Sequence, residues 1–187
     1  MSSKKYKNVY LDDYFTIVGP LEKESHLKKY NLTMDDYYYK EKTFEQAEIK
    51  MQREVIDNLL LKNKLMNSEI DVLVGGDLSN QISVSCYAAS NYNIPFFGVY
   101  SACASFIEGL ITASELIESK RKAYAICVTS SHNLHAEKQF RFPIEYGAPK
   151  PATTTFTATG AVATLLTKEP SKIKIESYTI GKVEDMG

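Results

Sequence analysis

The sequence predicts an α/β fold in which a mixed five-stranded sheet is flanked by helices. Apolar runs at 71–77 and 123–128 indicate buried strands, because they lack the polar alternation of a half-exposed strand. The pattern at 43–65 has the period of an amphipathic helix, and residues 173–180 alternate as a half-exposed strand does. Strand and helix patterns that alternate along one chain are typical of α/β proteins.

The length and composition suit one domain, 1–187. The apolar share of 44% is enough for a core, and 22 basic against 23 acidic residues predict no strong attraction to nucleic acid or anionic lipid. The three cysteines have no framework spacing, which favours a reducing compartment. The N-terminus lacks the apolar segment of a signal peptide, and no apolar run approaches the ~18–20 residues of a membrane span. We therefore expect a soluble or peripherally attached protein.

The first part of the chain predicts two short strands and a surface excursion. The strands are expected at 9–11 and 14–18, and Gly19-Pro20 ends the second. Residues 21–42 are charged and rich in tyrosine without a sustained period, so we expect them at the surface. The tyrosines at 37–39 are expected to cover the protein's own core, the alternative being a surface for a partner.

The middle of the chain predicts two helices and two strands. Thr43 and Gln46 fit a capping box at the start of the helix at 43–65. After the buried strand at 71–77, a short buried helix is expected at 79–91, with Cys86 in the core, and a strand at 95–100.

The last part predicts a helix after Cys103, a buried strand and a long loop. The strand at 123–128 places Cys127 in the core. Residues 129–133 follow at its carboxyl end, where open α/β sheets usually bind ligands. A loop as long as 131–152 is uncommon inside a domain, and its mixture of aromatic and charged residues favours a function. Further strands are expected at 154–167 and 173–180.

Cys103 is the best candidate in the sequence for a catalytic or ligand-binding residue. It lies between a short strand and a helix, where unpaired backbone N–H groups favour negative charge. Such a position can activate a thiol as a nucleophile, or hold a carboxylate or an oxyanion. The alternative is that Cys103 is a small buried apolar residue, as most free cysteines are.

His132 is the candidate base for a catalytic Cys103, because a nucleophilic thiol needs a base or an electropositive site. His132 and His135 have H-x-x-H spacing, which could place two ligands on one metal ion. No further soft ligand or carboxylate is placed to complete such a site, so we predict no metal and no cofactor. His135 is otherwise expected to be a loop residue at the surface.

The loop at 131–152 combines cations with aromatic rings. These residues are Lys138, Arg141 and Lys150 among Phe140, Phe142 and Tyr146. The set suits a flat anionic ligand, because rings can stack on it and cations can pair with its carboxylates. The alternative is that the two phenylalanines anchor the loop to the core while the cations face water.

Four parts of the sequence resemble known families. Residues 101–106 (SACASF) resemble the nucleophile segment of thiolase-like enzymes, including ketoacyl synthases. From about residue 43 to the end, the chain resembles the stage V sporulation protein AD family of spore-forming bacteria. The segments that carry this second resemblance are 76–81, 130–133 together with 136–143, and 145–147 followed by 150–151.

The resemblance implies a thiolase-like fold built of two similar α/β halves, of which this chain is expected to be the N-terminal one. The histidine and the second polar residue that complete a condensing-enzyme site come from the other half. We therefore expect a non-enzymatic protein. The alternative is an acyltransferase or condensing enzyme that forms an acyl thioester on Cys103.

The resemblance also implies that the protein binds dipicolinic acid, free or as its calcium chelate, and helps its uptake or release in spores, including in germination. By position, the expected ligand contacts are Cys103, His132, Asn133, Gln139, Arg141 and Tyr146.

The expected partners are other spore membrane proteins of the same operon, with no nucleic acid. The expected location is the cytoplasm or forespore, peripheral to the inner spore membrane. A homodimer is expected through the strand at 95–100, which in related enzymes pairs with its copy across a twofold axis. A third hypothesis makes the tyrosine-rich segment at 30–39 a docking surface for other spore proteins.

Overall fold

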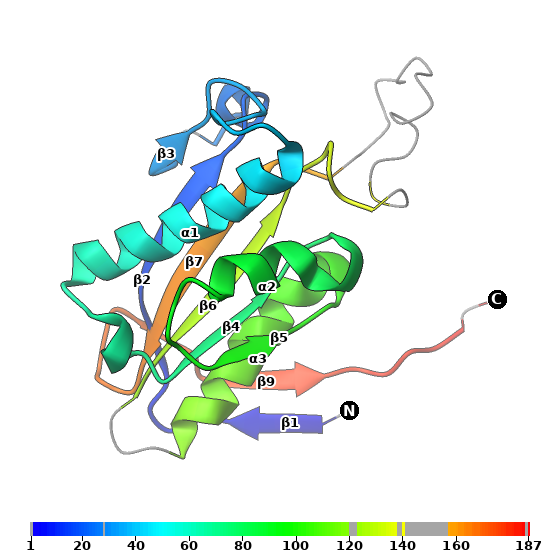
Figure 1. Ribbon diagram of the computed structural model, residues 1–187. Coiled ribbons are helices and arrows are strands. Elements are labelled where there is room, and N and C mark those ends of the chain that lie inside the picture. Colours follow the sequence, from blue (N-terminus) through cyan, green and yellow to red (C-terminus); the bar gives the residue numbers. More distant parts are fainter. Residues whose placement is uncertain (1, 28, 120–122, 138–139, 141–156, 186) are drawn as a thin grey trace.

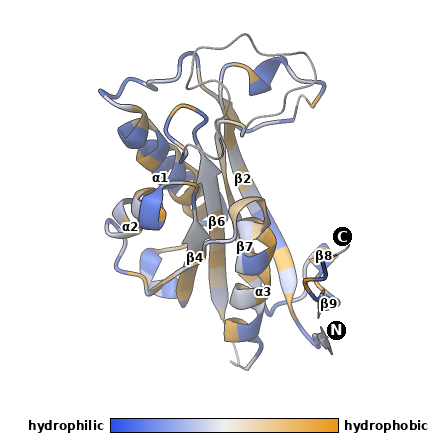
Figure 2. Cartoon of the chain, turned by 90° about the vertical axis from the view of Figure 1, so that its right-hand side faces the viewer, coloured by the Kyte–Doolittle hydropathy of each residue, from blue (hydrophilic) through white to orange (hydrophobic). Residues whose placement is uncertain are grey.

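The computed structural model describes residues 2–27, 29–119, 123–137, 140, 157–185 and 187. A mixed sheet forms the centre of the molecule (Figure 1). Helices α1 (Phe44–Asn63) and α2 (Ser83–Ala89) cover one face, and α3 (Ser105–Glu118) covers the other. Figure 2 views the sheet from its side and separates these three layers.

The main sheet has seven strands in the order β3-β2-β7-β6-β4-β5, with β8 also paired to β2. Their bounds are β2 Tyr10–Val18, β3 Leu32–Thr33, β4 Val72–Gly76, β5 Phe96–Gly98, β6 Tyr124–Ser131, β7 Gly160–Thr167 and β8 Ile173–Lys174. β7 is antiparallel to both β2 and β6, whereas β4 is parallel to β5 and β6. The carboxyl ends of β2, β4, β5 and β6 therefore meet at one edge of the sheet.

The predicted α/β class is confirmed, and five strands, β2, β7, β6, β4 and β5, form the body of the sheet. The two-residue strands β3 and β8 extend it along β2. The strands predicted at 9–11 and 14–18 are one strand, because the pairing of β2 with β7 continues across a register shift between Leu11 and Asp13.

Helix α1 begins as predicted at Thr43, whose Oγ1 accepts a hydrogen bond from the Gln46 N–H at 3.2 Å. The Gln46 side chain accepts from the Lys42 N–H rather than from the cap residue. Met51, Val55 and Leu59 are at most 1% exposed and pack on the sheet. Burial of this apolar face stabilises the helix more than its capping does, because each large side chain contributes about 1.5–3 kcal/mol.

The helix predicted at 79–91 is shorter than expected, and the prediction that Cys86 lies in the core is wrong. A single 3-10 turn, Asn80–Ile82, precedes α2, and Gln81 and Ile82 have positive φ angles of 56° and 48°. These left-handed residues interrupt the helical period. Cys86 is therefore exposed, and the buried positions of α2 are Val84, Ser85, Ala88 and Ala89.

On the other face, α3 packs on β4 and β6 through Ala113 and Ile117, which are fully buried. Cys127 of β6 lies in the same apolar cluster, as predicted, and its burial raises the pKa of its thiol to about 12. A thiol in this state is an inert core residue.

A second, two-stranded sheet pairs β1 (Ser2–Lys5) with β9 (Ser177–Ile180) beside α3. The single strand predicted at 173–180 is thus divided between β8 and β9. Between these two strands, the Ile175 N–H donates to the Val9 carbonyl oxygen, and the Glu176 carbonyl oxygen accepts from the Tyr6 N–H. Tyr6 and Tyr178 then attach this small sheet to α3, together with a 2.5 Å ion pair between Lys4 and Glu115.

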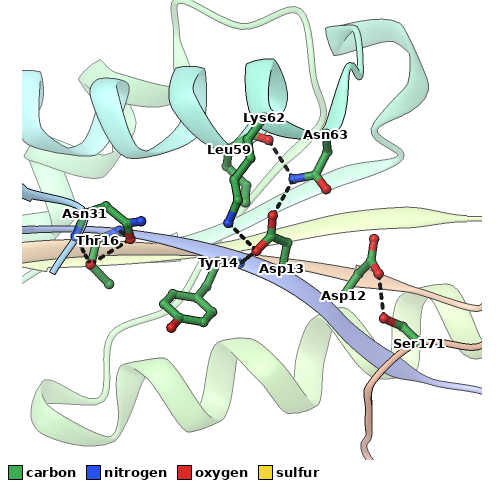
Figure 3. A network of polar contacts seen from close by, with 9 residues as sticks. All are labelled: Asp12, Asp13, Tyr14, Thr16, Asn31, Leu59, Lys62, Asn63 and Ser171. Carbon is green, nitrogen blue, oxygen red and sulfur yellow. Dashed lines mark hydrogen bonds and ion pairs between the residues drawn. The ribbon is translucent and has the colours of Figure 1, made fainter. Parts of the chain in front are cut away.

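Polar side chains close the exposed edge of β2 (Figure 3). Asp13 accepts from the Tyr14 N–H at 2.9 Å and pairs with Lys62 of α1 at 2.7 Å. The Asn31 side chain accepts from the Thr16 N–H at 2.9 Å, as a neighbouring strand would. The N–H groups of Tyr14 and Thr16, which could attract another strand, are therefore occupied.

Within the described part of the chain, no helix combines the length and the apolar character that a membrane span requires.

Candidate functional site

A cavity of about 460 Å³ lies at the carboxyl edge of the sheet. Its walls come from the ends of β2, β4 and β6, from the first residues of β7, and from the start of α3. Ligand cavities in proteins commonly have volumes of ~300–1,000 Å³. The residues that line it are Thr16, Ile17, Val18, Glu22, Tyr30, Gly76, Asp77, Leu78, Ala102, Cys103, Ser105, Phe106, Thr129, Ser130, Ser131, Thr157, Ala158, Thr159, Gly160, Ala161 and Val162.

Cys103 is exposed and lines this cavity, so it is not the buried apolar residue of the alternative interpretation. It lies in a 3-10 turn, Ala102–Ala104, that leads directly into α3. Ala102 has a positive φ of 48°, a conformation that costs a residue with a Cβ about 1–2 kcal/mol. Ser105 Oγ accepts from the Ser101 N–H at 2.9 Å and holds the turn. The turn thus places the thiol and the positive end of α3 at the cavity.

Hydroxyl groups dominate the polar part of the lining, and two carboxylates accompany them. Asp77 is 1% exposed and accepts from the backbone N–H groups of Ser79 and Ser85, each at 2.7 Å, and from the Ser79 hydroxyl. Glu22 accepts from the Thr159 N–H at 2.9 Å. Among the lining residues that the structure describes there is no lysine or arginine. The positive end of α3 and the hydroxyl hydrogens are therefore the groups in this lining that favour an anion.

His132 is fully buried beside the cavity rather than in its lining. Its Nε2 lies 2.9 Å from the Tyr37 carbonyl oxygen, and its Nδ1 accepts from the Leu134 N–H at 3.3 Å. The ring stacks on Phe44, and Phe44 also stacks on Tyr38. Both ring nitrogens are thus engaged in structural contacts, and the contacts of His132 include none with Cys103. Of the three tyrosines expected to cover the core, Tyr39 packs against it, whereas Tyr38 is 49% exposed and stacks on Phe44.

Asn133 reaches the cavity through Thr159, a lining residue. Its side-chain oxygen accepts from the Thr159 hydroxyl at 2.9 Å, and its N–H donates to the same hydroxyl at 3.1 Å. His135 has a different neighbour, Glu45 of α1, with 3.4 Å between Nδ1 and Oε1. In the described residues no group of three potential metal ligands occurs. Gln139, Arg141 and Tyr146, the other predicted ligand contacts, lie outside the described residues, as do Lys138 and Lys150.

Glu48 and Gln52 are the residues near the site that the sequence interpretation missed. Both are at most 1% exposed, and both contact Ser130 in the cavity lining. They follow Ala47 and Met51 on the same flank of α1. Their polar side chains flank an apolar stripe, so the local sequence assigns them to solvent and carries no signal for their burial.

Comparison with known families identifies the chain. The model of the family described as stage V sporulation protein AD (SpoVAD) matches residues 3–187. Stage V sporulation protein AD of Bacillus subtilis (strain 168) is 38% identical over 180 residues, which are 96% of this chain and 53% of that protein. The chain belongs to the SpoVAD family. It is thereby placed among sporulation proteins, and it spans about half the length of this curated relative.

Solved structures show which fold this SpoVAD family member has. A 3-oxoacyl-[acyl-carrier-protein] synthase III from Aquifex aeolicus VF5 matches with a TM-score of 0.52 and 17% identity, over 91% of this chain and 55% of that one. A fungal type III polyketide synthase, ORAS, matches with a TM-score of 0.59 and 11% identity, over 87% and 56% of the two chains. The fold is thiolase-like, as predicted, and covers about half of each larger protein. At these identities the likeness concerns the fold alone.

Proposed function

We propose that this SpoVAD family member is a non-enzymatic binding protein whose cavity beside Cys103 holds dipicolinic acid, and that it helps the uptake or release of this acid in spores. The observation that carries the proposal is a ligand-sized cavity at the carboxyl edge of the sheet, into which α3 presents its N-terminus. The family supports the connection with sporulation.

The lining suits a flat ring with two carboxylates. Phe106 and Val162 offer apolar contact to a ring, while Thr129 and Ser131 offer hydroxyl groups. Hydroxyl and backbone N–H donors at a helix N-terminus stabilise carboxylates without a charged side chain. This agrees with the flat anionic ligand that the sequence predicts for the loop at 131–152.

Gln139, Arg141 and Tyr146 are proposed to complete the site from that loop, with Arg141 pairing with one carboxylate. Direct contact of His132 and Asn133 with the ligand stays a prediction. Their contacts support a second role, in which Asn133 orients the Thr159 hydroxyl and His132 anchors the turn before the loop.

Isothermal titration calorimetry tests the proposal with free dipicolinate and with its calcium chelate. Isophthalate, which keeps both carboxylates but lacks the ring nitrogen, is the control ligand. Binding of dipicolinate that is at least tenfold tighter than binding of isophthalate is the expected result. Absence of heat from the folded protein with both forms of the ligand would remove the proposal for this chain.

Acyl transfer through Cys103 is the second candidate, and the exposure of this thiol at the start of α3 is the observation that favours it. Incubation with several acyl-CoA donors, followed by intact mass measurement, decides it. An acyl adduct in the wild type but not in Cys103→Ala would establish the thioester. Unmodified protein with every donor would exclude it.

A homodimer through β5 is also proposed, and the two edges of the sheet support it. The β2 edge is closed by side chains and short strands, whereas among the described residues β5 pairs with β4 alone. Phe97 and Tyr100 are 49% and 48% exposed beside this open edge. A second copy of β5 would extend the sheet and cover both rings. Association with spore membrane proteins of the same operon is proposed from the family alone.

A further inference from the structure

The side chains of β6 alternate between the two faces of the sheet, and this alternation decides which of them reach the cavity. Cys127 lies in the apolar cluster beneath α3, so Thr129 and Ser131 lie on that same face at the carboxyl end of the strand. Both of them line the cavity. Val162 of β7 is paired with Thr129 and also lines the cavity, because paired residues of neighbouring strands share a face. The floor of the cavity thus places a hydroxyl group beside an apolar side chain.

Several hydroxyl groups of the lining donate their hydrogen within the protein. Ser131 donates to a backbone carbonyl oxygen at 2.5 Å. Thr16 donates to the Asn31 side-chain oxygen at 3.0 Å, and the fully buried Thr159 donates to the Asn133 side-chain oxygen at 2.9 Å. A hydroxyl group has one hydrogen, so these three residues can offer a ligand only an acceptor.

Thr129 differs from these residues. Its side chain is partly exposed in the cavity, and among the residues that the structure describes its hydroxyl has no hydrogen-bond partner. Ser105 at the start of α3 is in a different position, since it is 3% exposed and its oxygen accepts from the Ser101 N–H. The Thr129 hydrogen is therefore available to a molecule in the cavity.

We propose that Thr129 is a specificity-determining residue of the cavity, whose hydroxyl donates to one carboxylate of the ligand. This inference rests on the proposed function, because it takes dipicolinate as the ligand. With a carboxylate at Thr129, the ring of the ligand lies against Val162 of the floor and Phe106 of α3, which both line the cavity.

The charges of the lining explain why a donor at this position matters. Asp77 and Glu22 bring carboxyl groups to the cavity, and the described part of the lining contains no lysine or arginine. An anion that leaves water for such a site must be stabilised by hydrogen-bond donors and by the positive end of α3. Hydrogen bonds to a charged group are stronger than those between neutral groups. Loss of the Thr129 hydroxyl should therefore weaken the binding of a carboxylate more than it affects the fold.

Calorimetric titration of dipicolinate and of isophthalate tests the inference, with the wild type, Thr129→Val and Thr129→Ser. Valine keeps the shape and the strand preference of threonine but removes the hydroxyl, whereas serine keeps the hydroxyl. Thr164→Val is the matched control. Thr164 lies on the same face of β7 as Val162, but it is 2% exposed and donates to the Cys127 carbonyl oxygen outside the cavity lining.

Thr129→Val is expected to weaken the binding of dipicolinate about tenfold to a hundredfold. Isophthalate should lose affinity by the same factor, because it carries the same carboxylates. Thr129→Ser and Thr164→Val should bind dipicolinate as the wild type does. Urea unfolding should show no loss of stability in Thr129→Val, since its hydroxyl holds no other described residue in place.

Three results would overturn this inference and leave the proposed function intact. These are unchanged binding of dipicolinate by Thr129→Val, an equal loss of affinity in Thr129→Ser, and an equal loss in Thr164→Val. The second and third would show that the affinity follows the packing of the strands rather than the hydroxyl. Absence of dipicolinate binding by the wild type would overturn both the inference and the proposed function.

Discussion

Gly109 of α3 lies so close to Cys127 of β6 that a methyl group at position 109 would come within 2.6 Å of the Cys127 Sγ. This contact brings α3 down onto the sheet six residues after Cys103. The close packing of α3 on the sheet therefore fixes how far the start of the helix, and the Cys103 thiol beside it, lies from the sheet at the cavity.

Gly109→Ala is predicted to destabilise the protein. Overpacking against a buried sulfur costs about 1–3 kcal/mol, while the better helix propensity of alanine returns up to ~1 kcal/mol. In a Cys127→Ala background the sulfur is absent, so the same substitution should be neutral or stabilising. Urea unfolding of the four proteins measures this coupling. An equal effect of Gly109→Ala in both backgrounds would show that the close contact does not limit the packing.

Cys103 is predicted to react with iodoacetamide more slowly when dipicolinate is bound. Cys103 lines the cavity, Cys86 is exposed outside its lining, and Cys127 is buried. Peptide mass mapping should show alkylation of both exposed thiols in the free protein. Dipicolinate should slow the alkylation of Cys103 only. The rate should fall about tenfold or more when the site is occupied about nine-tenths of the time or more. Equal slowing at Cys86 would indicate a general effect on the protein rather than occupation of the cavity.

Phe97→Asp is predicted to dissociate the proposed dimer. A charge placed beside the open edge of β5 would be buried without a partner if two copies paired there. Sedimentation velocity over a range of concentrations should give a dimer for the wild type and a monomer for this variant. Leu61→Asp is the matched control, since Leu61 is 77% exposed at the far end of α1. Dissociation by both variants, or by neither, would contradict an interface through β5.

Helix α1 and the central strands were predictable because their patterns are long or evenly buried. The expected helix at 43–65 agrees with α1, and the apolar runs at 71–77 and 123–128 agree with β4 and β6. The parallel pairing of these two strands brings their carboxyl ends together, which is why residues 129–133 were expected near a ligand. Residues 129–131 line the cavity, whereas His132 and Asn133 lie beside it.

Features that depend on distant pairing were not predictable from local pattern. β1 consists of two serines and two lysines, and it is a strand because β9 pairs with it and Tyr6 anchors its end. Glu48 and Gln52 have polar side chains that a periodicity argument assigns to water. Their burial depends on Ser130 and Ser85, which other elements supply.

Lowering the pH through the range around 6 is predicted to destabilise the protein through His132. Burial is the main cause that lowers the pKa of His132, and the neighbouring His135 lowers it further, while Glu45 and the Tyr37 carbonyl oppose this. The Leu134 N–H donates to Nδ1, so the neutral ring carries its hydrogen on Nε2 and donates to Tyr37. A second proton on Nδ1 would face the Leu134 N–H and break that contact.

The sign follows from proton binding. Because the folded pKa lies below the unfolded value of about 6.5, the unfolded state binds more protons as the pH falls. The contribution of neutral His132 to stability is complete above pH 6.5 and is lost below it, by about 1.4 kcal/mol for each unit of pKa difference. The difference in unfolding free energy between the wild type and His132→Gln, which does not titrate, should therefore decrease from pH 7.5 to pH 5.

Urea unfolding at several pH values measures this difference, with His26→Gln as the control because His26 is exposed. The His26 variant should follow the wild type through the whole range. A constant difference between the wild type and His132→Gln from pH 7.5 to 5 would mean that the ring gains its proton equally in the folded and unfolded states. In that case the stacking on Phe44 and the contact with Leu134 would not depend on a neutral ring.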